Sequence, residues 1–157
     1  MKLSIGSDHG GFLLKEDVKN YLISKGYDVI DEGCYSQERV EYPVFAVKVS
    51  DDDYEKKTDF GILICTSGIG MSICANKHKG IRAALVMNED AAKFSRLHNN
   101  ANVICMGAKY LNKDEACHFV EVFLETEFEG GRHEKRVEMI NNLDKLKGEK
   151  NGQISYL

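Results

Sequence analysis

The chain has 157 residues, 43% hydrophobic and 29% charged, so it is about one domain long and close to the average soluble globular protein. Its 21 Lys and Arg against 25 Asp and Glu give a net charge of -4, which disfavours a nucleic-acid partner. No apolar run is long enough for a membrane span, and the first residues form a strand pattern rather than a signal peptide.

Short apolar segments alternate with helical patterns along the chain. The predicted strands are residues 3–7, 27–30, 60–65, 82–86 and 103–106. The predicted helices fill the segment between the first two strands, residues 43 to about 51, segments beginning near Gly70, near Asn88 and after Asn112, and residues 134–146. This alternation, with continuously apolar strands, predicts a three-layer α/β fold around a five-stranded parallel sheet.

No linker or repeat divides the chain. We therefore expect one domain over residues 1–147, followed by a tail at 148–157. The segment 134–146 is amphipathic, with an apolar stripe that includes Val137, Ile140 and Leu143. We expect this last helix to pack on a partner subunit.

Two glycine-rich turns follow predicted strands and carry reactive side chains. Residues 7–11, Ser-Asp-His-Gly-Gly, follow the first strand, and Cys65 begins the turn after the third. A glycine turn before a helix can direct N–H groups at an anion, so we expect the thiolate form of Cys65 to be favoured. The simpler alternatives are a helix cap at Ser7 or Asp8 and a packed, unreactive Cys65.

Two further clusters contain histidine and arginine. We expect the segment 96–100, Arg-Leu-His-Asn-Asn, to join both glycine turns at the carboxyl ends of the strands, where open α/β sheets bind ligands. Arg132 and Arg136, with His133 between them, lie one helical turn apart and suit a phosphate dianion. A surface turn and a solvated basic face are the alternatives.

Other phosphate, cofactor and metal motifs fail on inspection. Ile73 occupies the third small position of a dinucleotide fingerprint, and Met71 stands where a cysteine phosphatase loop needs arginine. The five cysteines are an odd number without a Cys-x-x-Cys pair. We therefore predict no cofactor, no metal site and no disulfide framework, and we expect a reducing cytoplasm.

These groups together suit the aldose–ketose isomerisation of a sugar phosphate. That reaction opens the sugar ring, removes a proton beside the carbonyl, holds an enediolate and returns the proton one carbon away. A base, a histidine acid and fixed N–H donors supply those needs.

At these residues the chain resembles the type B ribose-5-phosphate isomerases, in the family that also contains the galactose-6-phosphate isomerase subunits. The resemblance runs from Lys2 to about Leu146. The motifs that carry it lie at residues 6–11, 41–43, 61–70, 75–77, 80–83, 98–103 and 128–133.

The resemblance implies a Rossmann-like α/β/α subunit that forms a homodimer or a dimer of dimers, with each site built from two chains. It also implies a metal-independent interconversion of D-ribose 5-phosphate and D-ribulose 5-phosphate through a cis-enediolate, within the non-oxidative pentose phosphate pathway.

Residue roles carry over by position in this sequence. Cys65 matches the base that acts between C1 and C2, and His98 matches the acid of ring opening. Thr66, Ser67, Gly68, Ile69 and Gly70 match the anion hole around the enediolate. The positions that match substrate contacts, including the phosphate clamp, are Asp8, His9, Tyr42, Asn99, Lys109, Arg132, His133 and Arg136.

Two positions depart from the family pattern. Met71 replaces a glutamate base present in some relatives, which leaves proton abstraction to Cys65, and Lys109 replaces an arginine whose planar fork is thereby lost. The Gly-Gly-Arg-His segment at 130–133 is typically missing from galactose-6-phosphate subunits, so the pentose hypothesis leads. Allose 6-phosphate or galactose 6-phosphate as substrate, and a non-catalytic phosphate sensor, are the alternatives.

Overall fold

Five parallel strands form one sheet, as the sequence predicted, and their order in the sheet is β2-β1-β3-β5-β4. The computed structural model describes residues 1–146, and the predicted tail at 148–157 lies outside the described residues. The strands are β1 Lys2–Ser7, β2 Asp28–Gly33, β3 Phe60–Cys65, β4 Ala83–Leu85 and β5 Val103–Gly107.

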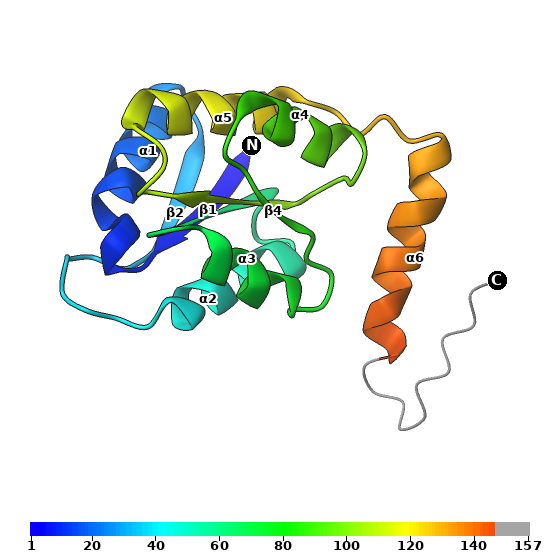
Figure 1. Ribbon diagram of the computed structural model, residues 1–157, viewed down its shortest axis with the longest axis horizontal. Coiled ribbons are helices and arrows are strands. Elements are labelled where there is room, and N and C mark those ends of the chain that lie inside the picture. Colours follow the sequence, from blue (N-terminus) through cyan, green and yellow to red (C-terminus); the bar gives the residue numbers. More distant parts are fainter. Residues whose placement is uncertain (147–157) are drawn as a thin grey trace.

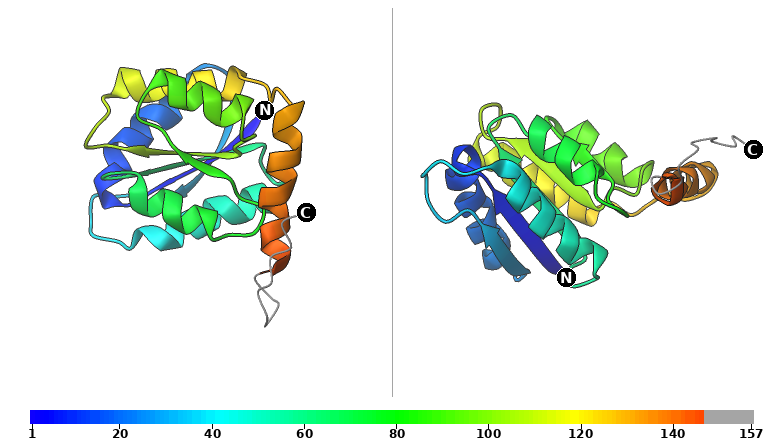
Figure 2. Two further views of the ribbon diagram at one scale, coloured as in Figure 1. Left: turned by 45° about the vertical axis from the view of Figure 1, so that its right-hand side comes forward. Right: turned by 90° about the horizontal axis from the view of Figure 1, so that it is seen from below.

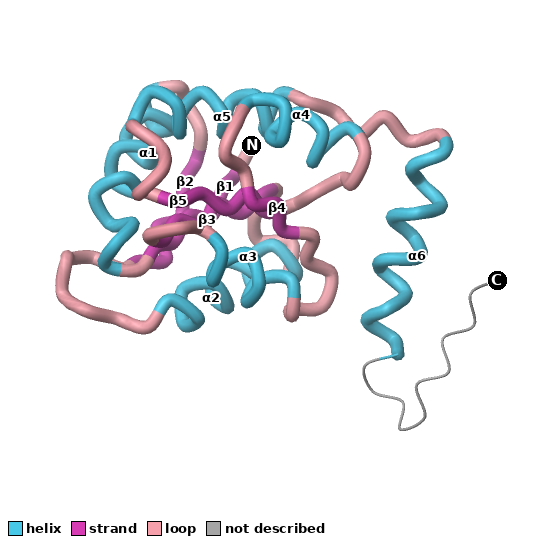
Figure 3. Tube along the Cα trace, viewed as in Figure 1, coloured by secondary structure: helices cyan, strands magenta, loops and turns pink. Residues whose placement is uncertain are grey.

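Helices cover both faces of this sheet (Figure 1; Figure 3). They are α1 Phe12–Ser24, α2 Tyr42–Tyr54, α3 Ile69–Asn76, α4 Glu89–Leu97, α5 Lys113–Glu125 and α6 Arg132–Leu146, with a short 3-10 helix at His9–Gly11. Helices α1, α4 and α5 lie on one face, and α2 and α3 lie on the other. None of the helices described is both long and apolar enough to cross a membrane.

The alternation of side chains along each strand produces two separate cores. In β3, Ile62 and Ile64 pack with residues of α1, α4 and α5, whereas Leu63 and Cys65 pack with residues of α2 and α3. Successive residues of a strand point to opposite faces, so an uninterrupted apolar strand serves both layers. Cys65 thus sits at the last position of a strand that is buried on both sides.

Local signals set the helix ends close to their predicted positions. Asn112 accepts a hydrogen bond from the Glu115 N–H at 2.8 Å, and the Glu115 carboxylate accepts one from the Asn112 N–H at 3.2 Å. This is the predicted capping box. The Asn88 side chain caps the start of α4 by accepting a single hydrogen bond from the Ala91 N–H.

The chain order places a switch point between β1 and β3. The connection from β1 leads to β2 on one side, and the connections after β3 lead to β5 and β4 on the other side. Loops at the carboxyl ends of strands separate at such a point and leave room for a ligand. Ser7 and Cys65 end these two strands.

Helix α6 lies outside the two helical layers, beside β4 (Figure 1; Figure 2). Its Val137 and His133 are buried against the rest of the chain. Polar contacts also hold it, since the Gly80 N–H donates to Asp144 and the Arg82 guanidinium donates to Asn141. Met139, Ile140 and Leu143 on the same helix remain exposed.

Candidate active site

Cys65 lies at the carboxyl end of β3 with its sulfur directed at the following turn. The Gly68 N–H donates to Cys65 Sγ at 3.1 Å, and the residue is only 4% exposed. An N–H donor at this distance stabilises negative charge on sulfur. Helix α3 begins at the next residue, Ile69, so its positive end faces the same region.

Glycines allow the turn after Cys65 to pack tightly. Gly68 has a φ of +77°, and a Cβ there would reach 2.8 Å from the Met106 carbonyl carbon. A Cβ on Gly10 would collide with the hydroxyl of Thr66. The Thr66 side chain is therefore held against the 3-10 helix that follows β1, which brings the two predicted glycine turns together.

Asp8 and His9 follow β1 and face the same edge. Asp8 Oδ1 accepts from the Gly11 N–H at 3.0 Å, so the capping role is present. His9 Nδ1 accepts from the Val40 N–H at 3.3 Å. A neutral imidazole that accepts at Nδ1 carries its proton on Nε2, so His9 can offer an N–H donor to a ligand.

Tyr42 and Lys109 complete the part of the site that lies at this edge. Tyr42 begins α2 and packs on the glycine turn, where a Cβ on Gly70 would come to 2.7 Å from its ring. The Lys109 N–H donates to the Thr66 carbonyl at 2.9 Å, and its side chain is exposed. We call the following set the carboxyl-edge cluster: Asp8, His9, Tyr42, Cys65, Thr66, Ser67, Gly68, Ile69, Gly70 and Lys109.

The remaining predicted residues gather elsewhere, as a second set. His98 follows the end of α4, and its ring stacks on His133 of α6 with centroids 4.1 Å apart and planes 12° apart. Arg132 Nε donates toward His133 Nε2 at 3.4 Å. We call this set the amino-edge cluster: His98, Asn99, Arg132, His133 and Arg136.

The two clusters lie at opposite edges of the sheet. Gly61, at the start of β3, pairs with Val103, whereas Cys65 pairs with Gly107 at the other end. His98 precedes Val103 by five residues and so lies at the amino edge. The strand alone separates the two edges by roughly 13 Å, from four steps of about 3.3 Å.

The expectation that the segment 96–100 joins the glycine turns was therefore wrong. A helix that follows a parallel strand returns the chain to the amino edge, so a segment between a helix and the next strand lies there. Asn102 illustrates this position, because its N–H donates to the carbonyl of Arg82, the residue before β4. One copy of the chain does not bring His98 to Cys65.

Burial and charge shape the amino-edge cluster. Burial, together with the neighbouring His98 and Arg132, lowers the pKa of His133, which favours its neutral form. Arg132 and Arg136 are exposed on the first turns of α6. A neutral imidazole beside two guanidinium groups makes a suitable surface for an anion.

Glu129 is a member of this region that sequence reasoning did not identify. Its Oε2 lies 3.7 Å from His98 Nε2 and 3.9 Å from His133 Nε2. These three residues offer one potential metal-ligand atom each, all within 4.8 Å. Arg132 Nε donates to His133 Nε2, so the lone pair of this nitrogen is engaged by a cation and is not free to bind a metal ion. Glu129 lies within the motif at residues 128–133, and that motif was the available signal.

Three of the other cysteines lie in surroundings that favour the neutral thiol. Cys105 is completely buried in β5, and burial raises the pKa of its thiol. Burial also raises the pKa of Cys74, which is only half-buried, and raises that of Cys117 to about 11. A neutral thiol is favoured at these three positions, as expected of a packed side chain rather than of a reactive one.

Comparisons with known proteins identify the family of the chain. The Ribose/Galactose Isomerase family model matches residues 3–140. The chain is 41% identical over 143 residues to ribose-5-phosphate isomerase B of Escherichia coli, which covers 91% of this chain and 96% of that protein.

Solved structures give the same result. A Clostridium thermocellum ribose-5-phosphate isomerase B matches with a TM-score of 0.91 and 45% identity, over 92% of this chain and 98% of that one. The Mycoplasma genitalium ribose-5-phosphate isomerase B, solved with bound ribulose-5-phosphate, matches with a TM-score of 0.88 and 40% identity, over 92% and 96%. From its fold and these relatives, the chain belongs to the ribose/galactose isomerase family.

Proposed function

We propose that this protein is an aldose–ketose isomerase that interconverts D-ribose 5-phosphate and D-ribulose 5-phosphate without a metal or other cofactor. The observation that carries the proposal is the Cys65 sulfur, which accepts an N–H bond at 3.1 Å beside the start of a helix. The bound ribulose-5-phosphate of the Mycoplasma genitalium relative supports the choice of pentose. The Gly-Gly-Arg-His segment at 130–133 supports it as well.

The residues divide the reaction into two parts. His98 gives a proton to the ring oxygen as the bond from that oxygen to C1 breaks, and the C1 hydroxyl releases its proton to solvent as the aldehyde forms, from which His98 is reprotonated. The Cys65 thiolate then removes the proton from C2 of the open aldehyde and returns it to C1, while the proton of the C2 hydroxyl moves to O1, so that no net proton is consumed. Backbone N–H groups of residues 66–70, with the hydroxyls of Thr66 and Ser67, hold the enediolate between these two steps.

We further propose that a second copy of the chain completes each site. The edge-to-edge separation within one chain leaves Cys65 without His98 and without the clamp of Arg132 and Arg136. A homodimer, or a dimer of dimers, in which the amino-edge cluster of one copy meets the carboxyl-edge cluster of the other removes this problem. In each site the partner's clamp then binds the phosphate of a sugar that lies against Cys65.

Exposed apolar side chains support such an assembly. They lie on three helices. They comprise Ile69 and Ile73 of α3, Phe94 of α4 and Met87 just before the N-cap of that helix, and Met139, Ile140 and Leu143 of α6. An exposed apolar surface of this kind marks an interface. We propose that residues 1–147 form one domain whose last helix packs on the partner, and that the protein, with all five cysteines free, works in the cytoplasm of the cell.

Turnover of a defined substrate panel tests the activity. We expect kcat/KM for ribose 5-phosphate to exceed the values for allose 6-phosphate and galactose 6-phosphate, with chelator present throughout. A higher kcat/KM for one of the six-carbon sugars would instead assign the protein as an isomerase of that sugar phosphate, within the same family. Binding of all three sugars without turnover would instead indicate a phosphate sensor.

Isotope exchange tests the division of labour between the two clusters. Ribulose 5-phosphate is already an open-chain sugar. Cys65 can therefore exchange the C1 proton of this sugar for deuterium from D2O without a ring-opening step. His98→Asn should therefore lose most isomerisation of ribose 5-phosphate but keep C1 exchange at saturating ribulose 5-phosphate. Equal loss of both reactions would contradict the proposed role of His98.

A further inference from the structure

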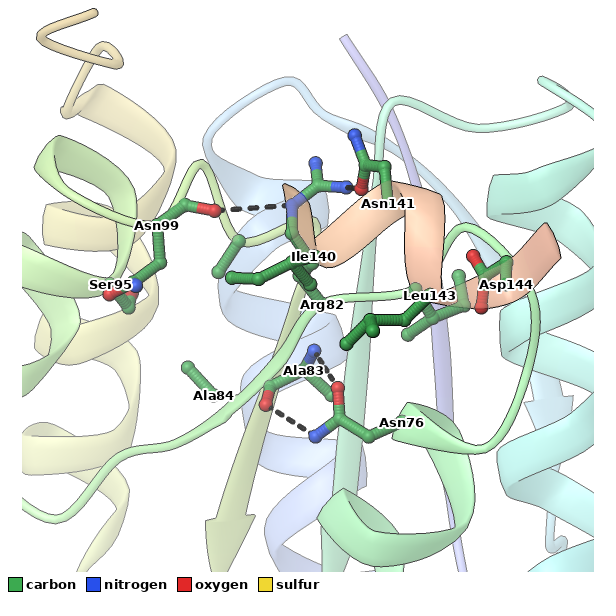
Figure 4. Close-up of a pocket in the computed structure, with 12 residues that line it drawn as sticks. Asn76, Arg82, Ala83, Ala84, Ser95, Asn99, Ile140, Asn141, Leu143 and Asp144 are labelled. Atoms are coloured by element: carbon green, nitrogen blue, oxygen red, sulfur yellow. Dashed lines mark hydrogen bonds between the residues drawn. The ribbon is translucent and has the colours of Figure 1, made fainter. Parts of the chain in front are cut away.

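Arg82 occupies a central position in the amino-edge region, and the proposed chemistry does not use it. It precedes β4 and lies within the motif at residues 80–83, one of those that carry the family resemblance. Figure 4 shows its guanidinium between Asn99 and Asn141, beside a groove of about 430 Å³ between α6 and the start of β4. Its backbone is fixed, because the Arg82 N–H donates to Asn102 Oδ1 at 2.7 Å.

The guanidinium holds the turn that presents His98 and Asn99. Arg82 Nε donates to the carbonyls of Asn99 and Asn100 at 3.1 Å each, and Nη2 donates to the Asn100 carbonyl at 2.8 Å. Asn100 has a φ of +45°, in the left-handed region that is uncommon for residues other than glycine, although Asn adopts it more readily than most. Several charge-assisted bonds at this position stabilise a turn that the backbone alone disfavours.

The same guanidinium also holds α6. Arg82 Nη1 donates to Asn141 Oδ1 at 2.7 Å, more than two turns beyond Arg132. One planar group therefore joins the turn that carries His98 to the helix that carries Arg132 and Arg136. Lysine has the charge but lacks the fork that reaches both elements together.

From these contacts we propose that Arg82 is a positioning residue that fixes the distance between the ring-opening acid and the phosphate clamp. The inference rests on the proposed isomerase function. It assigns Arg82 no contact with the sugar. Catalytic groups misplaced by about 1 Å can lose up to about 100-fold in rate, so the effect should appear in turnover.

Arg82→Gln and Asn141→Ala separate the two connections. Arg82→Gln removes the bonds to the turn at Asn99 and Asn100 and also the bond to Asn141 of α6. We expect its kcat for ribose 5-phosphate to fall about tenfold or more. We expect its maximal rate of C1 exchange in ribulose 5-phosphate to stay within about twofold of the rate of the unmodified protein. Asn141→Ala removes only the connection to α6, so we expect KM to rise several-fold with kcat nearly unchanged. Arg82→Lys should resemble Arg82→Gln, and it decides the matter if the glutamine variant does not fold.

Parallel measurements distinguish this inference from its premise. If the unmodified protein does not isomerise ribose 5-phosphate, the proposed function fails. If the unmodified protein isomerises ribose 5-phosphate and both Arg82 variants have the same kcat and KM as that protein, the positioning role fails. Folded Arg82 variants that lose isomerisation and C1 exchange equally would also overturn it, because Cys65 lies at the other edge of the sheet.

Discussion

Gly70→Ala should reduce activity without reducing stability, because the added methyl group would displace the ring of Tyr42. A Cβ built on Gly70 comes to 2.7 Å from Tyr42 Cζ, 2.9 Å from Cε2 and 3.0 Å from the phenol oxygen. Ordinary contact begins at 3.4 Å, so the ring must move by about 0.7 Å. Tyr42 is 37% exposed, so its ring has room to move toward solvent.

The magnitudes follow from this geometry. Gly70 lies in the first turn of α3, where alanine is favoured over glycine by up to about 1 kcal/mol, so the variant should unfold at the same or higher denaturant concentration. A ring displaced by about 0.7 Å should lower kcat/KM by roughly tenfold, within the range for misplaced groups. Steady-state kinetics and chemical denaturation measure the two quantities.

The background Tyr42→Ala provides the matched control. Without the ring, the added methyl group has nothing to displace, so Gly70→Ala should change kcat/KM by less than about twofold in that background. The same tenfold loss in both backgrounds would refute the reasoning, since the methyl group would then act through the turn itself.

Three other substitutions test separate parts of the account. Cys65→Ala should abolish turnover while substrate still binds, as measured by calorimetry with ribose 5-phosphate; a retained rate would remove Cys65 from its role. Arg136→Ala should chiefly raise KM, because a phosphate contact contributes to the ground state and the transition state alike; a fall in kcat alone would contradict this. Burial raises the pKa of Asp53 from 3.8 to about 6, so the folded state loses stability as pH rises through this range, by up to about 3 kcal/mol. Asp53→Asn should therefore unfold at higher denaturant concentration than the parent at pH 7 but not at pH 4, and an equal difference at both pH values would exclude this cause.

The sequence was sufficient to predict the sheet and most helix ends. Continuous apolar strands predicted β3 at its observed bounds, and Asn112 with Glu115 predicted the start of α5. The apolar pattern of β3 and the cap of α5 each depend only on residues that are close together in the sequence. The predicted second strand ended at Ile30, short of the observed Gly33, because Asp31 and Glu32 interrupt its apolar pattern. Asp31 pairs with Lys15 and Lys19, a contact between distant residues that periodicity does not report.

The arrangement of the site was only partly predictable. The turns after β1 and β3 meet as expected, because both follow strands at the switch point. The segment 96–100 was misplaced, since its residue types were considered without the direction of α4. Arg82 and Glu129 were missed because their contacts join elements that are far apart in the chain.

Subunit mixing tests most directly whether one site requires two chains. Cys65→Ala and His98→Asn chains should each be inactive, but a mixed dimer has one site with both defects and one intact site. Random pairing makes about half of the dimers mixed, so the mixture should recover about a quarter of the unmodified activity. If mass spectrometry shows that mixed dimers have formed and the mixture remains as inactive as its components, the two clusters do not meet across a subunit interface.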